Sequence, residues 1–148
     1  MPEYDWLWVK AQAYQESRFN PAAVSPVGAV GLMQIMPGTG REMARRTGVD
    51  GPLTSPLVNV LYGTAYDRRM LGIWSAPRTP GERLELAHAS YNAGAGHIIK
   101  AQRLAGGHHA WRCISLFLEQ VTGRHSAETI SYVRLIKQWY HKLKEDAA

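Results

Sequence analysis

The chain has 148 residues, of which 45% are hydrophobic and 20% are charged, and this composition is typical of a single soluble globular domain. No apolar run is long enough to cross a membrane, and the N-terminus has neither the basic nor the apolar segment of a secretory signal. We therefore expect synthesis in the cytoplasm. Cys113 is the only cysteine, which excludes an internal disulfide. The net charge of +5 favours anionic polymers as partners: peptidoglycan, anionic lipids or nucleic acid.

In chain order, the first predicted helix begins after Asp5, whose carboxylate can cap it, and it ends before Asn20-Pro21. Ser55-Pro56 predicts the start of a long helix, with serine as the cap and proline in the first position. Apolar residues at helical spacing support this second helix; they are Leu57, Val58, Leu61, Ala65 and Met70.

Thr79-Pro80-Gly81-Glu82 is typical of a capping box, and the helix that it starts should run to Asn92 and be broken by Gly94 and Gly96. Further helices are predicted over residues 97–104, 110–121 and 127–145. The sequence has no strand alternation, no repeat and no linker long enough to divide it. We expect one all-α domain over residues 1–148, built as an orthogonal helical bundle.

Glu16 is the candidate catalytic residue. It lies near the end of the first predicted helix, and no other carboxylate occurs between Ser17 and Arg41. A carboxyl group in this position faces the negative end of the helix dipole, which disfavours its ionisation. The group is therefore suited to hold a proton near neutral pH and to act as a general acid. A solvated glutamate at a helix end is the simpler alternative.

Four segments resemble, in order, the signature blocks of the Slt-type (family 1) lytic transglycosylases, which are lysozyme-like enzymes that cut bacterial peptidoglycan. The segments are Glu16-Ser17, Gly31-Leu32-Met33-Gln34, Ala89-Ser90-Tyr91-Asn92-Ala93-Gly94 and Glu128-Thr129-Ile130-Ser131-Tyr132-Val133. The resemblance extends from about Trp8 to Tyr140. It implies the lysozyme-like version of the orthogonal bundle in a single domain.

The resemblance also implies roles for individual residues. Glu16 would be the catalytic acid, and the substrate contacts would come from Ser17, Met33, Gln34, Tyr91, Asn92, Glu128 and Tyr132. Met33 would be an apolar wall of the cleft, or else a core residue. Glu128 would support the cleft floor, or else only favour the start of its helix. Tyr132 would point towards Glu16.

The implied reaction cleaves the β-1,4 bond between N-acetylmuramic acid and N-acetylglucosamine. Glu16 donates a proton to the bridging oxygen and then accepts the proton of the C6 hydroxyl, which attacks C1 and gives a 1,6-anhydromuramic end. One carboxylate suffices because the nucleophile is intramolecular. No cofactor is implied, and the histidines lack the spacing of a metal site.

Two alternatives stay open. A goose-type muramidase would hydrolyse the same bond, and an inverting hydrolase needs a second carboxylate roughly 6.5–9.5 Å from the acid. The second alternative is a non-catalytic module that binds the cell wall or anionic lipids. A binding module has no need of a carboxylic acid at Glu16, which favours the enzyme.

The stretch from Gly94 to Glu128 is longer than the compact family pattern, and we expect an added helical hairpin at about Gly106–Arg124. The last predicted helix is basic and amphipathic, which is consistent with attraction to an anionic membrane or lipopolysaccharide surface. We expect a monomer that binds peptidoglycan strands and no nucleic acid. A small enzyme of this type resembles a bacteriophage lysin, which reaches the wall through a holin lesion or as part of the virion.

Overall fold

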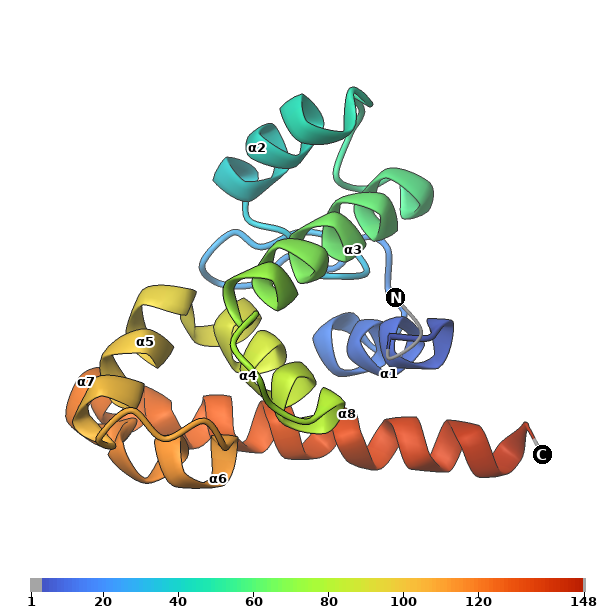
Figure 1. Ribbon diagram of the computed structural model, residues 1–148. Coiled ribbons are helices and arrows are strands. Elements are labelled where there is room, and N and C mark those ends of the chain that lie inside the picture. Colours follow the sequence, from blue (N-terminus) through green and yellow to red (C-terminus); the bar gives the residue numbers. More distant parts are fainter. Residues whose placement is uncertain (1–3, 148) are drawn as a thin grey trace. The chain divides into compact units, whose positions relative to one another are not determined.

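The computed structural model describes residues 4–147, and Figure 1 follows its helices from α1 to α8. The helices are α1 (Trp6–Ser17), α2 (Pro37–Thr47), α3 (Pro56–Ile73), α4 (Pro80–Ala93), α5 (Ala95–Leu104), α6 (Trp111–Ile114), α7 (Glu119–Thr122) and α8 (Ser126–Asp146), with 3₁₀ turns η1 (Ser115–Phe117) and η2 (Gly123–His125). Within residues 4–147 no extended strand forms, and the only sheet-like pairs are the isolated bridges Val24–Val30 and Val30–Ile35. The predicted all-α class is confirmed.

The described chain divides into two compact units. The first, which we call the N-terminal unit, contains residues 5–68 and 136–147, and the second, the central unit, contains residues 4 and 69–135. Helices α3 and α8 contribute residues to both units. None of the helices in residues 4–147 combines the length and the apolar character that a membrane crossing requires.

Helix α1 begins as predicted. The Asp5 carboxylate accepts hydrogen bonds from the backbone N–H groups of Leu7 (2.8 Å) and Trp8 (3.4 Å). This bond pattern satisfies N–H groups that have no partner inside the helix. The buried residues of α1 are Leu7, Ala11, Gln12 and Ala13, so α1 packs into the N-terminal unit through both small and larger side chains.

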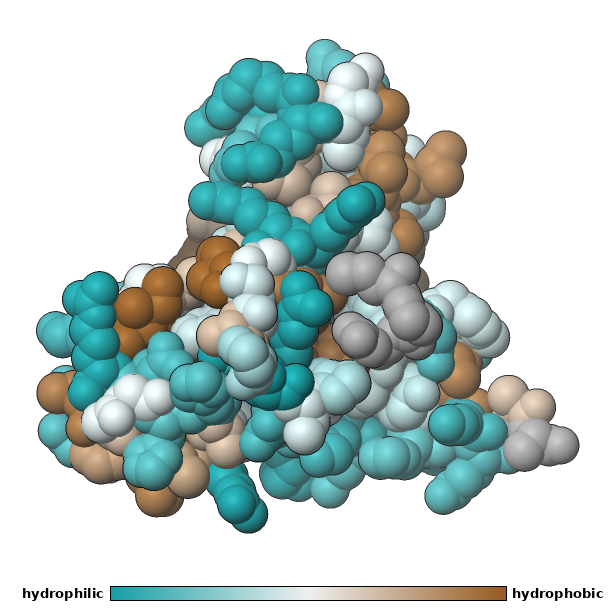
Figure 2. All heavy atoms as spheres, in the orientation of Figure 1, coloured by the Kyte–Doolittle hydropathy of each residue, from teal (hydrophilic) through white to brown (hydrophobic). Residues whose placement is uncertain are grey.

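Helix α2 is a helix that the sequence analysis did not predict. Its N-cap, Met36, provides no side-chain hydrogen bond, and glycines at positions 38 and 40 weaken the helical pattern. Two signals were nevertheless present. Pro37 occupies the first helical position, and Gly48 ends the helix in the left-handed conformation with φ of 70°. Figure 2 shows that hydrophilic residues cover most of the α2 region on the face drawn there.

Helix α3 starts at Pro56 as predicted, but its predicted apolar stripe is wrong at Leu57, which is 81% exposed. The buried face in the N-terminal unit instead carries polar groups with defined partners. The Tyr62 hydroxyl donates to the Val49 carbonyl oxygen at 2.7 Å, and the Gln12 amide donates to the Asp67 carboxylate at 3.2 Å. Hydrogen bonding makes burial of these groups tolerable.

In the central unit, the predicted capping box is confirmed. The Thr79 hydroxyl accepts from the Glu82 N–H at 3.3 Å, and the Glu82 carboxylate accepts from the Thr79 N–H at 3.0 Å. The bond from the Thr79 backbone N–H, together with a second one from the Thr79 hydroxyl at 2.9 Å, holds the pKa of Glu82 below its usual range. Gly94 ends α4, as predicted. Helix α5 begins at the next residue, so Gly96 lies inside α5 and does not interrupt a helix.

The single helix predicted over residues 110–121 is wrong. The chain forms α6, η1 and α7 in succession, because N–H groups such as that of Leu118 bond three residues back, to the Ser115 carbonyl oxygen at 3.2 Å. Trp111, Ile114 and Leu118 are all buried at helical spacing, so the direction of packing follows the pattern although the helix is interrupted. The last helix, α8, was predicted to within one residue at each end.

Candidate active site

The predicted site residues are divided between the two units. Glu16, Ser17, Met33 and Gln34 belong to the N-terminal unit, and Tyr91, Asn92, Glu128 and Tyr132 belong to the central unit.

Glu16 lies in the last turn of α1 and is partly buried. Two consecutive residues that follow it, Arg18 and Phe19, have positive φ values of 54° and 64°. For residues other than glycine this conformation costs about 1–2 kcal/mol each. Aromatic contacts hold the turn: the Arg18 guanidinium lies 4.4 Å from the Tyr14 ring centroid and 5.5 Å from that of Trp139. The turn after Glu16 is therefore fixed by side chains of α1 and α8.

Ser17 connects the end of α1 to the loop that carries Gln34. Its hydroxyl is 2.9 Å from the Leu32 carbonyl oxygen and 3.3 Å from that of Ala13, and it donates to them. The serine side chain thus fixes the position of its neighbour Glu16 relative to the loop. Its predicted contact with substrate stays a prediction.

The loop from residue 31 to 34 is a tight turn closed by two backbone bonds between Val30 and Ile35, at 3.0 and 2.9 Å. Gln34 itself has a positive φ of 47°. Its side-chain amide donates to the carbonyl oxygens of Gly31 (2.9 Å) and Ala23 (3.3 Å). These bonds use the N–H groups of the amide and not its oxygen, which keeps an acceptor on the side chain for a ligand donor.

Met33 is completely buried. Its side chain packs against the backbone of α3 at Gly63, where an added Cβ would lie only 2.7 Å from the Met33 Cβ. Of the two roles predicted for Met33, the structure therefore favours that of a core residue. Its burial argues against the predicted contact with substrate.

Asn59 is a functional candidate that the sequence analysis missed. Its side chain is fully buried and forms three hydrogen bonds: Oδ1 accepts from the Met33 N–H at 2.7 Å, and Nδ2 donates to the carbonyl oxygens of Val30 (2.8 Å) and Leu53 (2.7 Å). This amide holds the turn that carries Gln34 against α3. The sequence pattern that could have indicated this role is an asparagine among the apolar residues of a predicted helix. A buried amide at such a position is stable only if it is hydrogen-bonded.

In the central unit, the structure brings the end of α4 and the start of α8 together. The Thr129 hydroxyl donates to Asn92 Oδ1 at 2.7 Å, which fixes the orientation of the Asn92 amide. Asn92, Glu128 and Thr129 line one surface pocket of about 420 Å³. Tyr91 is partly exposed, whereas Tyr132 is only 5% exposed. Asn92 and Glu128 can therefore contact one ligand.

His97 and His125 line the same pocket. The sequence analysis considered the histidines only as metal ligands and missed both. His97 Nδ1 lies 2.7 Å from the Ala93 carbonyl oxygen; because a carbonyl oxygen only accepts, Nδ1 carries a proton and Nε2 is left for a ligand. The spacing of four residues between Ala93 and His97 was the available signal. Among residues 4–147 no three His, Cys, Asp or Glu side chains gather as metal ligands would.

Comparison with known proteins gives a consistent result. The family model of the transglycosylase SLT domain matches residues 1–114. A membrane-bound lytic murein transglycosylase F of Vibrio cholerae is 42% identical over 102 residues, which are 69% of this chain and 18% of that protein. The 70 kDa soluble lytic transglycosylase of Escherichia coli superimposes with a TM-score of 0.75 at 27% identity, over 95% of this chain and 22% of that protein.

A third relative is the lytic transglycosylase Slt of Pseudomonas aeruginosa, solved as an inactive glutamate-to-glutamine variant. It has a TM-score of 0.74 and 31% identity over 93% of this chain and 22% of that protein. The chain spans less than a third of the length of each relative. The matches confirm the lysozyme-like helical fold that the sequence predicted. The family match includes Glu16, Gln34 and Asn92 and ends before Glu128. The chain therefore belongs to the transglycosylase SLT domain family.

Proposed function

We propose that the protein is a peptidoglycan lytic transglycosylase that cleaves the β-1,4 bond between N-acetylmuramic acid and N-acetylglucosamine. The observation that carries the proposal is the position of Glu16: it lies in the family-matched segment, at a helix end held by Ser17 and by the Arg18 turn. The inactive glutamate-to-glutamine variant of the Pseudomonas aeruginosa relative supports the need for one glutamate in such enzymes.

In the proposed reaction, the protonated Glu16 carboxyl gives its proton to the bridging oxygen as the C1–O bond breaks. The positive charge that develops at C1 is stabilised by the N-acetyl group of the substrate and by polar groups such as Gln34 and Tyr132. The C6 hydroxyl then attacks C1 and its proton returns to Glu16. The carboxyl group is regenerated, the product has a 1,6-anhydromuramic end, and no water is consumed.

The surroundings of three other carboxylates argue against their acting as the base of a hydrolase. Asp5 caps α1 and accepts the Tyr140 hydroxyl at 3.0 Å, and Glu42 pairs with Arg46 at 2.9 Å. Asp67 is 1% exposed and accepts the Gln12 amide, so it is poorly placed to activate a water in an open cleft. Glu128 is exposed and lines a pocket, which makes it the candidate base if the enzyme is a hydrolase.

Digestion of purified peptidoglycan in ¹⁸O water tests the proposal. A lytic transglycosylase gives products one water lighter than hydrolysis products, with no ¹⁸O at the muramic end. Labelled reducing ends would identify a hydrolase, and no cleavage at all would favour the alternative of a binding module. The Glu16→Gln variant is the control for contaminating activity.

The biological setting is a separate part of the proposal. We propose action on the cell wall, with attraction to anionic membrane or lipopolysaccharide surfaces through the basic residues of α8. The role of a bacteriophage lysin, with release through a holin lesion or delivery in the virion, rests on the sequence resemblance alone. Complementation of a phage that lacks its own lysin tests this role.

A further inference from the structure

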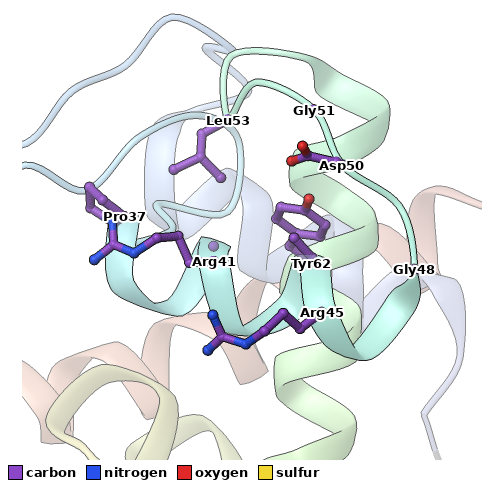
Figure 3. A pocket seen from close by; sticks show the side chains of 10 residues that line it. Pro37, Arg41, Arg45, Gly48, Asp50, Gly51, Leu53 and Tyr62 are labelled. Atoms are coloured by element: carbon purple, nitrogen blue, oxygen red, sulfur yellow. The ribbon is translucent and has the colours of Figure 1, made fainter.

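A second surface pocket, which we call the α2 pocket, lies entirely within the N-terminal unit (Figure 3). It has a volume of about 630 Å³ and lies between α2, the loop from residue 48 to 53, and Tyr62 of α3. None of the residues proposed above to act on the glycan lines this pocket. Its function is therefore not explained by the proposed cleavage reaction.

A hydrogen bond and a close backbone contact hold the frame of the α2 pocket in place. Gly48 ends α2 and turns the chain back over Tyr62, whose hydroxyl is bonded to the Val49 carbonyl oxygen at 2.7 Å. Gly51 packs so closely on α3 that an added Cβ would lie 2.8 Å from a methyl carbon of Val58. A ligand would thus enter a pocket that is largely formed before binding.

Among residues 4–147, the charged side chains of the α2 pocket form no ion pair. Arg41 and Arg45 are one helical turn apart, about 6 Å along the axis, and Figure 3 shows both extending to the same side of α2. Neither has a carboxylate partner among residues 4–147, although Arg46 of the same helix pairs with Glu42. The exposed Asp50 carboxylate is on the side of the loop.

This arrangement selects a class of ligand. Two guanidinium groups that extend to the same side of one helix can attract a carboxylate and bind it through charge-assisted hydrogen bonds. A neutral sugar would leave both cations unused, and a simple phosphate would offer no cation to the Asp50 carboxylate. A ligand with a carboxylate and a neighbouring ammonium group uses all three charges.

We propose that the α2 pocket binds the free end of a peptide stem of peptidoglycan, with its carboxylate on Arg41 and Arg45 and the ammonium group of a diamino acid near Asp50. The inference rests on the proposed function, because the glycan strands of that substrate carry such stems. Cross-linking of a stem consumes the ammonium group of its diamino acid. The α2 pocket would therefore select strands whose stems are not cross-linked.

Binding can be measured without catalysis. A soluble stem peptide that ends in a free diamino acid, titrated into the ¹⁵N-labelled protein, should shift the backbone signals of Arg41, Arg45 and Gly51. The same peptide acetylated on its side-chain amine should bind several-fold more weakly. If neither peptide shifts these signals at millimolar concentration, the proposal is wrong and the charges are merely solvated.

Kinetics give the second test. The double variant Arg41→Gln/Arg45→Gln should raise KM about tenfold on strands that carry stems, the size expected for two exposed charge contacts, with kcat unchanged. On strands stripped of stems by an amidase, KM should not change. The control Arg46→Gln/Arg68→Gln removes the same charge from the same unit outside the pocket. Equal KM values for the two double variants on stemmed strands would overturn the proposal.

The two proposals fail in different ways. If the wild-type protein releases no anhydromuramic product from either substrate, the proposed function is wrong, whatever the peptide titration shows. If the wild type cleaves both substrates and the Arg41→Gln/Arg45→Gln variant cleaves them equally well, only the α2 pocket proposal is wrong.

Discussion

Replacing Asn59 by alanine should destabilise the protein strongly. The substitution removes both side-chain donors and the acceptor that hold the turn beside α3, and it leaves the Met33 N–H and the Val30 and Leu53 carbonyl oxygens without these partners. The Met33 bond is buried, while the two carbonyl bonds are partly buried. The cost therefore differs between the three groups.

The magnitude follows from these burials. An unsatisfied buried donor costs about 1–3 kcal/mol, and a partly buried hydrogen bond contributes about 0.5–1.5 kcal/mol. Together the losses come to roughly 2–6 kcal/mol, a large part of the ~5–15 kcal/mol that stabilises a typical domain. For a chain of this length, a loss in the middle of this range lowers Tm by about 10 °C.

Urea unfolding followed by circular dichroism measures this loss. Asn20→Ala is the matched control, because Asn20 is exposed and its side chain accepts one bond, from the Ala22 N–H at 3.0 Å. We expect the control to cost less than about 1 kcal/mol. A loss below about 1 kcal/mol for Asn59→Ala as well would refute the reasoning, because the three bonds would then contribute nothing beyond those of an exposed turn.

Asn59→Asp adds a readout that a simple cavity would not give. The carboxylate keeps the acceptor for Met33 but faces the two carbonyl oxygens without a proton, so burial and repulsion should raise its pKa above the unfolded value of about 3.9. Protonation restores one donor. The deficit relative to wild type should therefore be smallest at low pH and grow as pH rises through the folded-state pKa.

Gly31 offers a check by double-mutant cycle. An added Cβ at this position would lie 2.3 Å from Asn59 Nδ2 and 2.5 Å from the Leu53 carbonyl oxygen, with φ at 82°. Gly31→Ala should therefore be strongly destabilising alone. Its cost should fall by about 1 kcal/mol in the Asn59→Ala background, because one of the two close contacts has been removed.

Three further predictions concern separate parts of the molecule. Glu16→Gln should lower the rate of peptidoglycan cleavage by at least ~10²-fold with an unchanged circular dichroism spectrum, and turbidity clearing at the wild-type rate would contradict its role as the acid. Burial lowers the pKa of His88 to about 4. Between this pKa and the unfolded value of ~6.5, the unfolded state binds the proton more readily than the folded state does. The free energy of unfolding should therefore fall by on the order of 3 kcal/mol as pH drops through this window. Urea unfolding of His88→Leu should show a smaller loss between pH 7 and pH 4, and an equal loss would exclude His88 as its source. Replacing Lys137, Lys142 and Lys144 by Gln should weaken binding to anionic vesicles, measured by sedimentation, by on the order of 1 kcal/mol per lysine. The salt dependence of this binding should also become weaker. Unchanged binding at low salt would leave α8 with a structural role only.

The features that could be predicted from the sequence are local ones. The Asp5 cap and the box of Thr79 and Glu82 depend on residues two or three positions apart, and both form as the pattern indicates. The candidate acid likewise stands out because it ends an apolar helix. In each case the residues that determine the geometry are neighbours in the chain.

The features that could not be predicted depend on distant contacts. Asn59 meets its partners at Val30 and Met33 only after α3 has packed against the turn. His97 and His125 converge only because the end of α4 and the start of α8 come together in the central unit. The helix predicted over residues 110–121 is interrupted although its buried residues Trp111, Ile114 and Leu118 keep helical spacing, so the apolar pattern alone does not reveal the break.

The contact between Arg18 and Trp139 has a consequence for how this protein is divided in the laboratory. The family match ends at residue 114, yet Trp139 of α8 lies over the guanidinium that holds the turn after Glu16. A fragment cut at the end of the family match would keep every signature residue up to Asn92 and lose this support. The segment that the family model matches is therefore shorter than the segment needed to support the turn after Glu16. Chimeras with related enzymes should exchange α1 and the end of α8 together.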